Sequence, residues 1–160
     1  MTSLRKATPA DHAALAGMRR DAALMAALMI DPAEAAAEPV ADWIARREAQ
    51  GHFRVVTDAT DRAVGFVQLT GQHRRNATAW LGIAIAAQEQ AKGHGGRALA
   101  ALCALASDLG LRKLKLEVRA DNTAAIALYR AHGFREVGRL EAEFDDGTQQ
   151  HDTLIMERLL

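Results

Sequence analysis

Residues 81–100 read LGIAIAAQEQAKGHGGRALA, and this stretch decides the fold. Its first part belongs to a nearly continuous apolar run, which indicates a strand buried on both faces. A glycine-rich loop from Gln90 to Arg97 follows, and an amphipathic helix comes after it. Several unpaired backbone N–H groups therefore converge at a helix N-terminus, where the helix dipole favours an anion. The pattern fits a phosphate cradle, although a flexible turn that opens a helix also fits the loop by itself.

Two other phosphate-binding patterns do not fit this loop. No Gly-Lys-Ser/Thr sequence ends it, so the metal ligand and the lysine of a P-loop are absent. Gly93 and Gly95 are not followed by a third glycine at the spacing of a dinucleotide-binding fingerprint. The loop also lies in the middle of the chain, well after the first expected strand, whereas that fingerprint follows the first strand.

Changes in apolar periodicity locate the other elements. Strands are expected at residues 4–7, 53–57, 63–70, 77–86, 113–118, 134–141 and 152–159, and helices at 13–30, 43–50, 96–109 and 122–132. Asp31 and Pro32 start a further helical segment, which Pro39 ends or kinks. Strands that alternate with helices in the second half predict an α/β layered fold with at least one right-handed parallel crossover.

A second motif lies within residues 114–134. Asp121 or Asn122 caps a helix there, and Gly133 stops it. Tyr129, near the end of this helix, is the only tyrosine of the chain. In a sequence with 4% aromatic residues, such a placement favours a functional role over bulk packing.

Composition excludes several classes of function. The 160 residues suffice for a single core, and we expect one domain over residues 1–160. Because 20 Lys and Arg balance 20 Asp and Glu, the chain lacks the basic surface that binds nucleic acids or anionic membranes. Cys103 has no partner, which excludes a disulfide framework and argues against structural zinc. No apolar run approaches the ~20 residues of a membrane span, and residues 1–12 lack the apolar region of a secretory signal. A cytoplasmic location is the simplest expectation.

Together these motifs resemble the GNAT superfamily of acetyl-CoA-dependent N-acetyltransferases. The resemblance covers about residues 79–139 and rests on Leu81–Ile85, on Gln90-x-x-Gly93-x-Gly95, and on Asn122-x-x-Ala125-x-x-Leu128-Tyr129-x-x-x-Gly133-Phe134. The chain is similar to the branch that acts on small amines and amino acids. Its Glu-Val-Arg-Ala-x-Asn stretch, residues 117–122, is also similar to the RimI-type alanine acetyltransferases.

This resemblance implies a mixed, mostly antiparallel sheet of about seven strands with flanking helices, in which the strands 79–85 and 113–118 splay apart. Acetyl-CoA would lie in the gap as the acetyl donor, and a primary amine of a small molecule would attack it directly. No metal is implied, and no nucleic acid or membrane partner is expected. Two alternatives stay open: acetylation of protein N-termini, and a non-catalytic acyl-CoA-binding sensor. Relatives often form homodimers.

The resemblance also implies roles for individual residues. The backbone of residues 83–85 would pair with the pantetheine arm like an added strand, and a backbone N–H there would stabilise the oxyanion. Amides 91–96 would hold the pyrophosphate, Asn122 would contact the cofactor arm, and the phenol of Tyr129 would protonate the CoA thiolate. The expected cofactor-binding residues are Ile83, Ala84, Ile85, Gln90, Ala91, Lys92, Gly93, His94, Gly95, Gly96, Arg97, Asn122, Ala125 and Tyr129.

Glu117 is the first candidate for the base that deprotonates the amine, because it resembles in position the glutamate of RimI-type members, twelve residues before Tyr129. Strand alternation over residues 113–119 also places it in a row of charged side chains, which is typical of a solvated or ion-paired face. His73 and His94 are further candidate bases.

Glu34 and Glu38 lie near the expected acceptor loop and are weak candidates for attracting a cationic amine. The electrostatics of a helix start explains them as well. Gly95 and Gly96 stand together before Arg97, which looks like a one-residue insertion relative to the family pattern. Which amides face the pyrophosphate is therefore open by one position, and Lys92 and Arg97 either contact the CoA phosphates or stay solvated.

Overall fold

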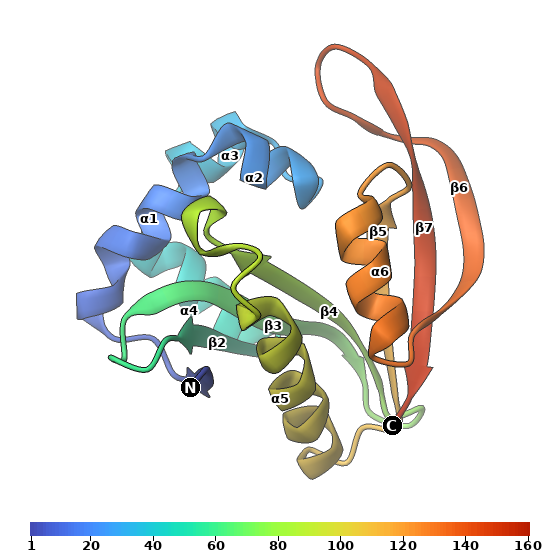
Figure 1. Ribbon diagram of the computed structural model, residues 1–160, viewed down its shortest axis with the longest axis horizontal. Coiled ribbons are helices and arrows are strands. Elements are labelled where there is room, and N and C mark those ends of the chain that lie inside the picture. The colour runs from blue at the N-terminus through green and yellow to red at the C-terminus, as the bar shows by residue number, and fades with distance from the viewer.

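A seven-stranded sheet forms the centre of the computed structural model, which describes residues 1–160 (Figure 1). The strands are β1 (Ser3–Arg5), β2 (His52–Thr57), β3 (Ala63–His73), β4 (Thr78–Ile85), β5 (Lys113–Arg119), β6 (Arg135–Asp145) and β7 (Gln150–Leu159). Their order across the sheet is β1-β2-β3-β4-β5-β7-β6. Only β4 and β5 are parallel, and all other neighbours are antiparallel. The predicted α/β fold with a mostly antiparallel sheet is confirmed.

Helices cover both faces of this sheet. They are α1 (His12–Arg20), α2 (Ala22–Ala27), α3 (Pro32–Ala37), α4 (Val40–Gln50), α5 (His94–Asp108) and α6 (Thr123–Ala131), with short 3-10 turns η1 (Pro9–Asp11) and η2 (Ala87–Glu89). One core joins α5 and α6 to alternate residues of β3, β4, β5 and β7. A second core joins α1 to α4 to the opposite side of β2, β3 and β4. The two faces are called here the α5/α6 face and the α1–α4 face.

Aromatic packing anchors α4 on the α1–α4 face. The Trp43 ring meets the rings of Phe53 on β2 and Phe66 on β3 edge-on, each with a centroid separation of 5.0 Å. Edge-to-face pairs add to the stabilisation that comes from burying these large side chains. The position of α4 along β3 is therefore fixed at Phe66.

One predicted helix is in fact two. The pattern of residues 13–30 indicates a single helix, whereas the structure ends α1 at Arg20 and begins α2 at Ala22. Asp21 adopts an extended backbone, and its side chain accepts a hydrogen bond from the Leu24 amide at 3.0 Å. A carboxylate that caps the next turn offers the backbone an alternative to continuing the helix. This local competition leaves the apolar stripe unchanged, so periodicity alone cannot detect it.

The sheet opens between β4 and β5. The pairing consists of Thr78 with Lys113, Ala79 with Leu114 and Trp80 with Lys115, and it stops there. β4 continues to Ile85 and β5 to Arg119, so the two strands separate toward their C-terminal ends, as Figure 1 shows. The expected splay is present.

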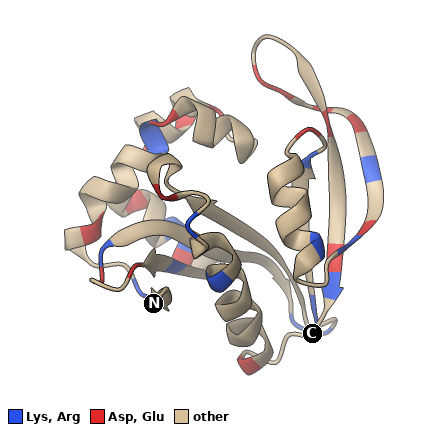
Figure 2. Ribbon diagram, in the orientation of Figure 1, with Lys and Arg blue, Asp and Glu red and all other residues tan.

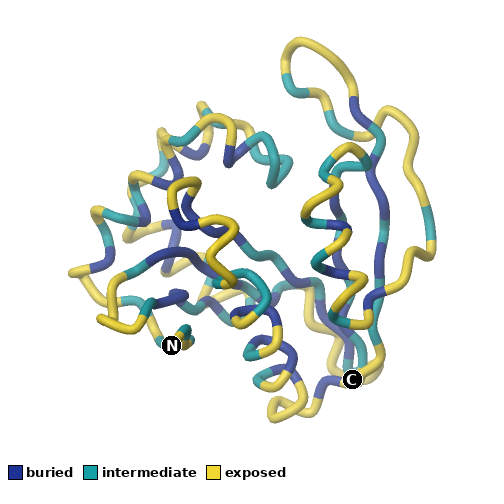
Figure 3. The backbone as a smooth tube through the Cα atoms, viewed as in Figure 1, coloured by how far each residue is buried: buried dark blue, intermediate teal, exposed yellow.

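Charges of both signs are spread along the chain. Basic and acidic residues are interspersed over the ribbon in Figure 2, in keeping with 20 of each sign. The edge strand β6 is exposed along most of its length (Figure 3). None of the helices combines the length and apolarity that crossing a bilayer requires.

Candidate active site

The gap between β4 and β5 leaves backbone groups of both strands without sheet partners. Beyond Trp80, β4 is bonded only to β3, while β5 continues to pair with β7 on its far side. The Gln90 side chain donates to the Ile85 carbonyl at 3.0 Å and ties the glycine loop to the end of β4. The inner edge of residues 81–85 is thus available to an extended ligand.

The glycine loop presents a series of free amides. Ala91 and Gly93 both have positive φ, +60° and +82°, and α5 begins at His94. The first amide to bond within the helix is that of Arg97, which donates to the Gly93 carbonyl at 3.3 Å. The amides of residues 91–96 make no hydrogen bond within the protein. Converging free N–H groups at a helix N-terminus are the kind of arrangement that suits an anion.

The paired glycines serve a second purpose beside the anion site. A Cβ on Gly95 would lie 3.3 Å from Leu128 Cδ2, and a Cβ on Gly96 would lie 3.3 Å from the His132 ring. Both residues therefore lie against α6. We attribute the additional glycine to this close contact between two helices.

The cations of the loop are partly engaged. Lys92 and Arg62 bind the two oxygens of buried Glu89 at 3.0 and 2.9 Å, and these hydrogen bonds lower the pKa of Glu89. The Arg97 guanidinium folds back and donates to the Lys92 carbonyl at 3.4 Å. His94 shares a 2.9 Å hydrogen bond with Thr2.

Tyr129 projects from α6 into the core of the α5/α6 face. It is 7% exposed, and its ring meets Phe134 edge-on at 5.8 Å. Burial raises the pKa of the Tyr129 hydroxyl to about 12, with no hydrogen bond contributing. The phenol is therefore a neutral proton donor at physiological pH.

Asn122 begins α6. Its side-chain oxygen accepts the Ala125 amide at 3.2 Å, as an N-cap residue does. This bond engages the backbone of Ala125 and one end of the Asn122 amide. The NH₂ end of Asn122 has no protein partner.

Glu117 lies on the other side of the sheet from Tyr129. Alternation along β5 buries Leu116 and Val118 in the α5/α6 core and turns Glu117 toward the α1–α4 face. The Glu117 carboxylate accepts a 2.7 Å hydrogen bond from the fully buried Thr153 hydroxyl of β7. The row of charges on β5 is thus confirmed as one face, and Glu117 in it bonds a hydroxyl instead of a cation.

The two acidic candidates in the α3 region differ in their surroundings. Glu34 is exposed in the first turn of α3. Glu38 bonds Arg46 through both carboxylate oxygens at 2.9 and 2.8 Å and Arg19 at 3.1 Å. A cationic amine at Glu38 would have to compete with two guanidinium groups. His73, the other candidate, accepts the Asn76 amide in the β3–β4 turn.

A polar cluster at the end of β5 escapes sequence reasoning altogether. Arg119 binds Asp121 through two nitrogens, at 2.7 and 3.0 Å, and reaches the Ala26 carbonyl of α2 at 3.4 Å. His151 Nε2 lies 2.6 Å from Asp146 Oδ2, and its Nδ1 lies 3.3 Å from Arg119. These residues come from three distant segments, so no local pattern connects them.

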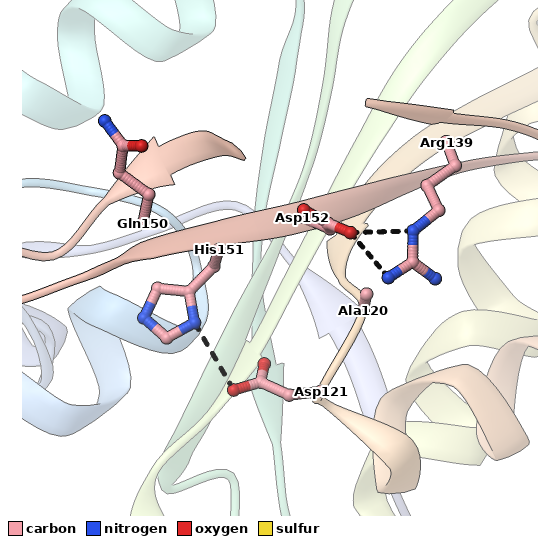
Figure 4. Close-up of a pocket in the computed structure, with 6 residues that line it drawn as sticks. All are labelled: Ala120, Asp121, Arg139, Gln150, His151 and Asp152. Carbon is pink, nitrogen blue, oxygen red and sulfur yellow. Dashed lines mark hydrogen bonds and ion pairs between the residues drawn. The ribbon is translucent and has the colours of Figure 1, made fainter. Parts of the chain in front are cut away.

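A pocket of about 370 Å³ adjoins this cluster (Figure 4). Its lining consists of Ala120, Asp121, Arg139, Gln150, His151 and Asp152. In Figure 4 the His151 and Asp121 side chains point toward each other, while Arg139 binds Asp152. No three His, Cys, Asp or Glu side chains are grouped to hold a metal ion.

A mixed sheet that opens between two parallel strands, with the free amides of a helix N-terminus beside the opening, is the architecture of the N-acetyltransferase class of fold. The family model described as "Acetyltransferase (GNAT) family" matches residues 21–134. The chain belongs to the GNAT family of acetyltransferases.

Solved structures share this architecture over nearly the whole chain. A spermidine N-acetyltransferase from Vibrio cholerae, in complex with CoA and spermine, has a TM-score of 0.88 and 24% identity, covering 99% of this chain and 95% of that one. A ribosomal-protein-alanine N-acetyltransferase from Brucella melitensis has a TM-score of 0.83 and 27% identity, covering 99% of both chains. The first of these likenesses shows a common fold.

A mycothiol acetyltransferase from Jonesia denitrificans is 42% identical over 92 residues. The match covers 55% of this chain and 29% of that protein. The chain therefore spans less than a third of the length of this curated relative.

Proposed function

We propose that the chain transfers an acetyl group from acetyl-CoA to the primary amine of a small molecule. One observation carries the proposal: the unpaired edge of β4 leads directly into six amides, residues 91–96, that have no partner in the protein. A strand edge suits the amide groups of a pantetheine arm, and free amides at a helix N-terminus suit a pyrophosphate. When bound, acetyl-CoA supplies an activated acetyl thioester.

Each part of the chain then has a defined task. Residues 83–85 orient the pantetheine arm, the amides of residues 91–96 hold the phosphates, and the NH₂ group of Asn122 is free to contact the arm. Because α5 and Tyr129 belong to one face and Glu117 to the other, the donor and the acceptor reach the gap from opposite faces of the sheet.

Proton transfer follows from this division. The acceptor amine forms the new C–N bond as the C–S bond breaks, and the amine proton passes to Glu117, directly or through water. Tyr129 supplies a proton to the departing sulfur, since its raised pKa keeps the hydroxyl protonated. The hydrogen bond from Thr153 orients the Glu117 carboxylate for its task.

Release of free thiol from acetyl-CoA tests the activity. The amines to be compared are amino acids, polyamines, aminoglycosides and short peptides, with binding of acetyl-CoA measured in parallel. We expect amine-dependent release with at least one class. Tight acetyl-CoA binding without release for any of these amines would instead indicate a non-catalytic acyl-CoA sensor.

Acetylation of protein N-termini is the second candidate function. It is favoured by the 27% identity to the ribosomal-protein-alanine enzyme over the full length of both chains. In this case a short peptide with a free N-terminus would be acetylated with a higher kcat/KM than any free amino acid. The same thiol assay distinguishes the two functions.

A further inference from the structure

Three buried polar side-chain atoms have no hydrogen-bond partner: Arg19 Nε, Arg47 Nε and Gln68 Oε1. Such atoms are rare in folded proteins, because desolvating them costs free energy that only a hydrogen bond offsets. Arg47 is the extreme case, since burial and neighbouring charges act on its guanidinium but no hydrogen bond does. The protein alone therefore leaves these three atoms without a hydrogen bond.

Arg47 and Gln68 are held at the same level of the sheet. Trp43, one turn before Arg47 on α4, rests on Phe66. Gly51, just beyond α4, lies so close to β3 that a Cβ would collide with the Leu69 carbonyl. α4 thus runs along β3 in the same direction, and the spacing of these two contacts puts Arg47, midway between them on α4, at the level of Gln68 along β3.

Gln68 connects this position to the gap. It pairs in register with Gly82 on β4, and a Cβ on Gly82 would come within 2.8 Å of its Nε2. The Gln68 side chain therefore lies across Gly82, two residues beyond Trp80, where β4 parts from β5. By strand alternation it shares the α1–α4 face with Phe66. Glu117 faces the same side.

The surrounding charge is positive. Arg19, Arg46 and Arg47 share a single carboxylate, Glu38, which pairs with the first two. Arg19 is 5% exposed and stacks over the Trp43 ring at 4.4 Å. Arg46 and Arg47 lower the pKa of Arg19 through charge repulsion, after the larger effect of burial. An anionic group would relieve this excess of positive charge.

We propose that Arg47 and Gln68 bind the acceptor, and that the acceptor is a free amino acid whose carboxylate contacts Arg47 and whose amino group donates to Gln68 Oε1. The inference rests on the proposed acetyl transfer and names its substrate class. An amino acid carries both complementary groups a few bonds apart. A polyamine offers nothing to Arg47 and is repelled by the guanidinium cluster, and a peptide N-terminus has an amide where the carboxylate would be. Both residues bind the substrate and take no part in the bond changes.

Matched substrate pairs test the carboxylate. The thiol assay would compare each common L-amino acid with its own α-amide, and with spermidine. We expect kcat/KM for the preferred acid to exceed that for its amide at least tenfold. The α-amino group of an amino-acid amide is a weaker base than that of the free acid and is more often unprotonated at neutral pH. The amount of reactive amine therefore favours the amide and cannot explain a preference for the acid.

Arg47→Met keeps the apolar stem and removes the charge. This substitution should raise KM for the acid about ten- to hundredfold, because one charge-assisted hydrogen bond to the substrate is lost. KM for the amide and for acetyl-CoA should change by no more than about twofold. Arg20→Met is the control, because Arg20 is exposed at the end of α1 and the same charge is removed there. Preference for amides or spermidine, or equal losses on acid and amide, would overturn the inference.

Calorimetry separates this inference from the proposed function. The preferred amino acid would be titrated into wild type and Arg47→Met in the presence of CoA, where no turnover occurs. Binding that Arg47→Met weakens supports the inference even if no thiol is ever released, an outcome that would refute only the proposed activity. Absence of amino-acid binding to the wild type would refute the inference and leave acetyl transfer to other amines intact.

Discussion

Tyr129 combines deep burial with a hydroxyl that no protein group binds. A residue that served packing alone could equally be phenylalanine, because the ring makes the apolar contacts and the hydroxyl bonds no protein group. The tyrosine is therefore best explained by what its proton can do. Its raised pKa of about 12 means that loss of this acid cannot cause any decline in rate at moderately alkaline pH.

Tyr129→Phe tests this role. We expect kcat to fall about 10²- to 10⁴-fold, the range of general acid catalysis, with acetyl-CoA affinity and thermal stability almost unchanged. Steady-state kinetics together with acetyl-CoA titration measure both quantities. Wild-type turnover in the phenylalanine variant would exclude Tyr129 as the acid.

Glu117 and Thr153 form a pair whose parts can be removed separately. Glu117→Gln should lower kcat strongly, because a carboxamide cannot accept the proton of the amine. Thr153→Val should cost less, because the carboxylate remains and only its 2.7 Å hydrogen bond is lost. Steady-state kinetics of both variants decide, and wild-type turnover in Glu117→Gln would leave water or another group as the base.

Residue-scale prediction from the sequence succeeded for local motifs only. The spacing from Asn122 to Tyr129 lies within one helix, so its cap was visible in the sequence. Arg47, Gln68 and His151 carry no such pattern. His151 stands out because of hydrogen-bond partners on distant segments, and Arg47 and Gln68 stand out because each has a buried polar atom without a partner. Neighbouring residues in the sequence reveal neither property.

At the scale of elements, the close contact between α5 and α6 depends on two glycines of α5, which have no side chains. Gly96→Val would press a branched side chain against the His132 ring, which lies 3.3 Å from the position of a Cβ. We expect a loss of about 1–3 kcal/mol of stability from overpacking and a higher KM for acetyl-CoA, because the start of α5 shifts.

Gly138→Val on β6 is the matched control, since nothing lies within 4 Å of a Cβ there. Thermal denaturation and acetyl-CoA kinetics compare the two variants. Equal effects of both substitutions would mean that Gly96 has no special packing role.

Most elements follow from the sequence because apolar periodicity and caps are local signals. The strand at residues 113–118 is β5 with one residue added, and the helix at 96–109 is α5 beginning two residues earlier. The division at Asp21 was not predictable from periodicity, since a side-chain hydrogen bond decides it. The splay followed from the family resemblance, because no pattern within β4 or β5 records where their pairing stops.

At the scale of the whole molecule, one ion pair ties the first strand to the start of the helical layer. Arg5 binds buried Asp11 at 2.7 and 2.9 Å, and the Thr8 amide donates to the same carboxylate at 2.7 Å. The pKa of Asp11 is lowered from 3.8 to about 2, and the hydrogen bond from Arg5 is the largest cause. The ionised form is thus favoured in the folded state.

This shift makes stability depend on pH. Since the folded pKa is below the unfolded one, the contribution is fully present above pH 3.8 and disappears as the pH falls toward about 2. It amounts to about 2 kcal/mol. Urea unfolding of wild type and Asp11→Asn should therefore differ most at neutral pH and converge under acid. A difference in the free energy of unfolding between the two proteins that stays constant down to pH 2 would contradict the role given to Asp11.

The three residue pairs that join β4 to β5 also determine how the sheet deforms. Only the edge pair β1–β2 has equally few partners in register, and the other four pairs have at least six each, so the weakest connection inside the sheet passes through the proposed active site. Thermal breathing of the two halves will concentrate there. A long, flexible donor such as acetyl-CoA can then enter sideways as the two halves separate. Its bound pantetheine arm would stiffen the connection between β4 and β5.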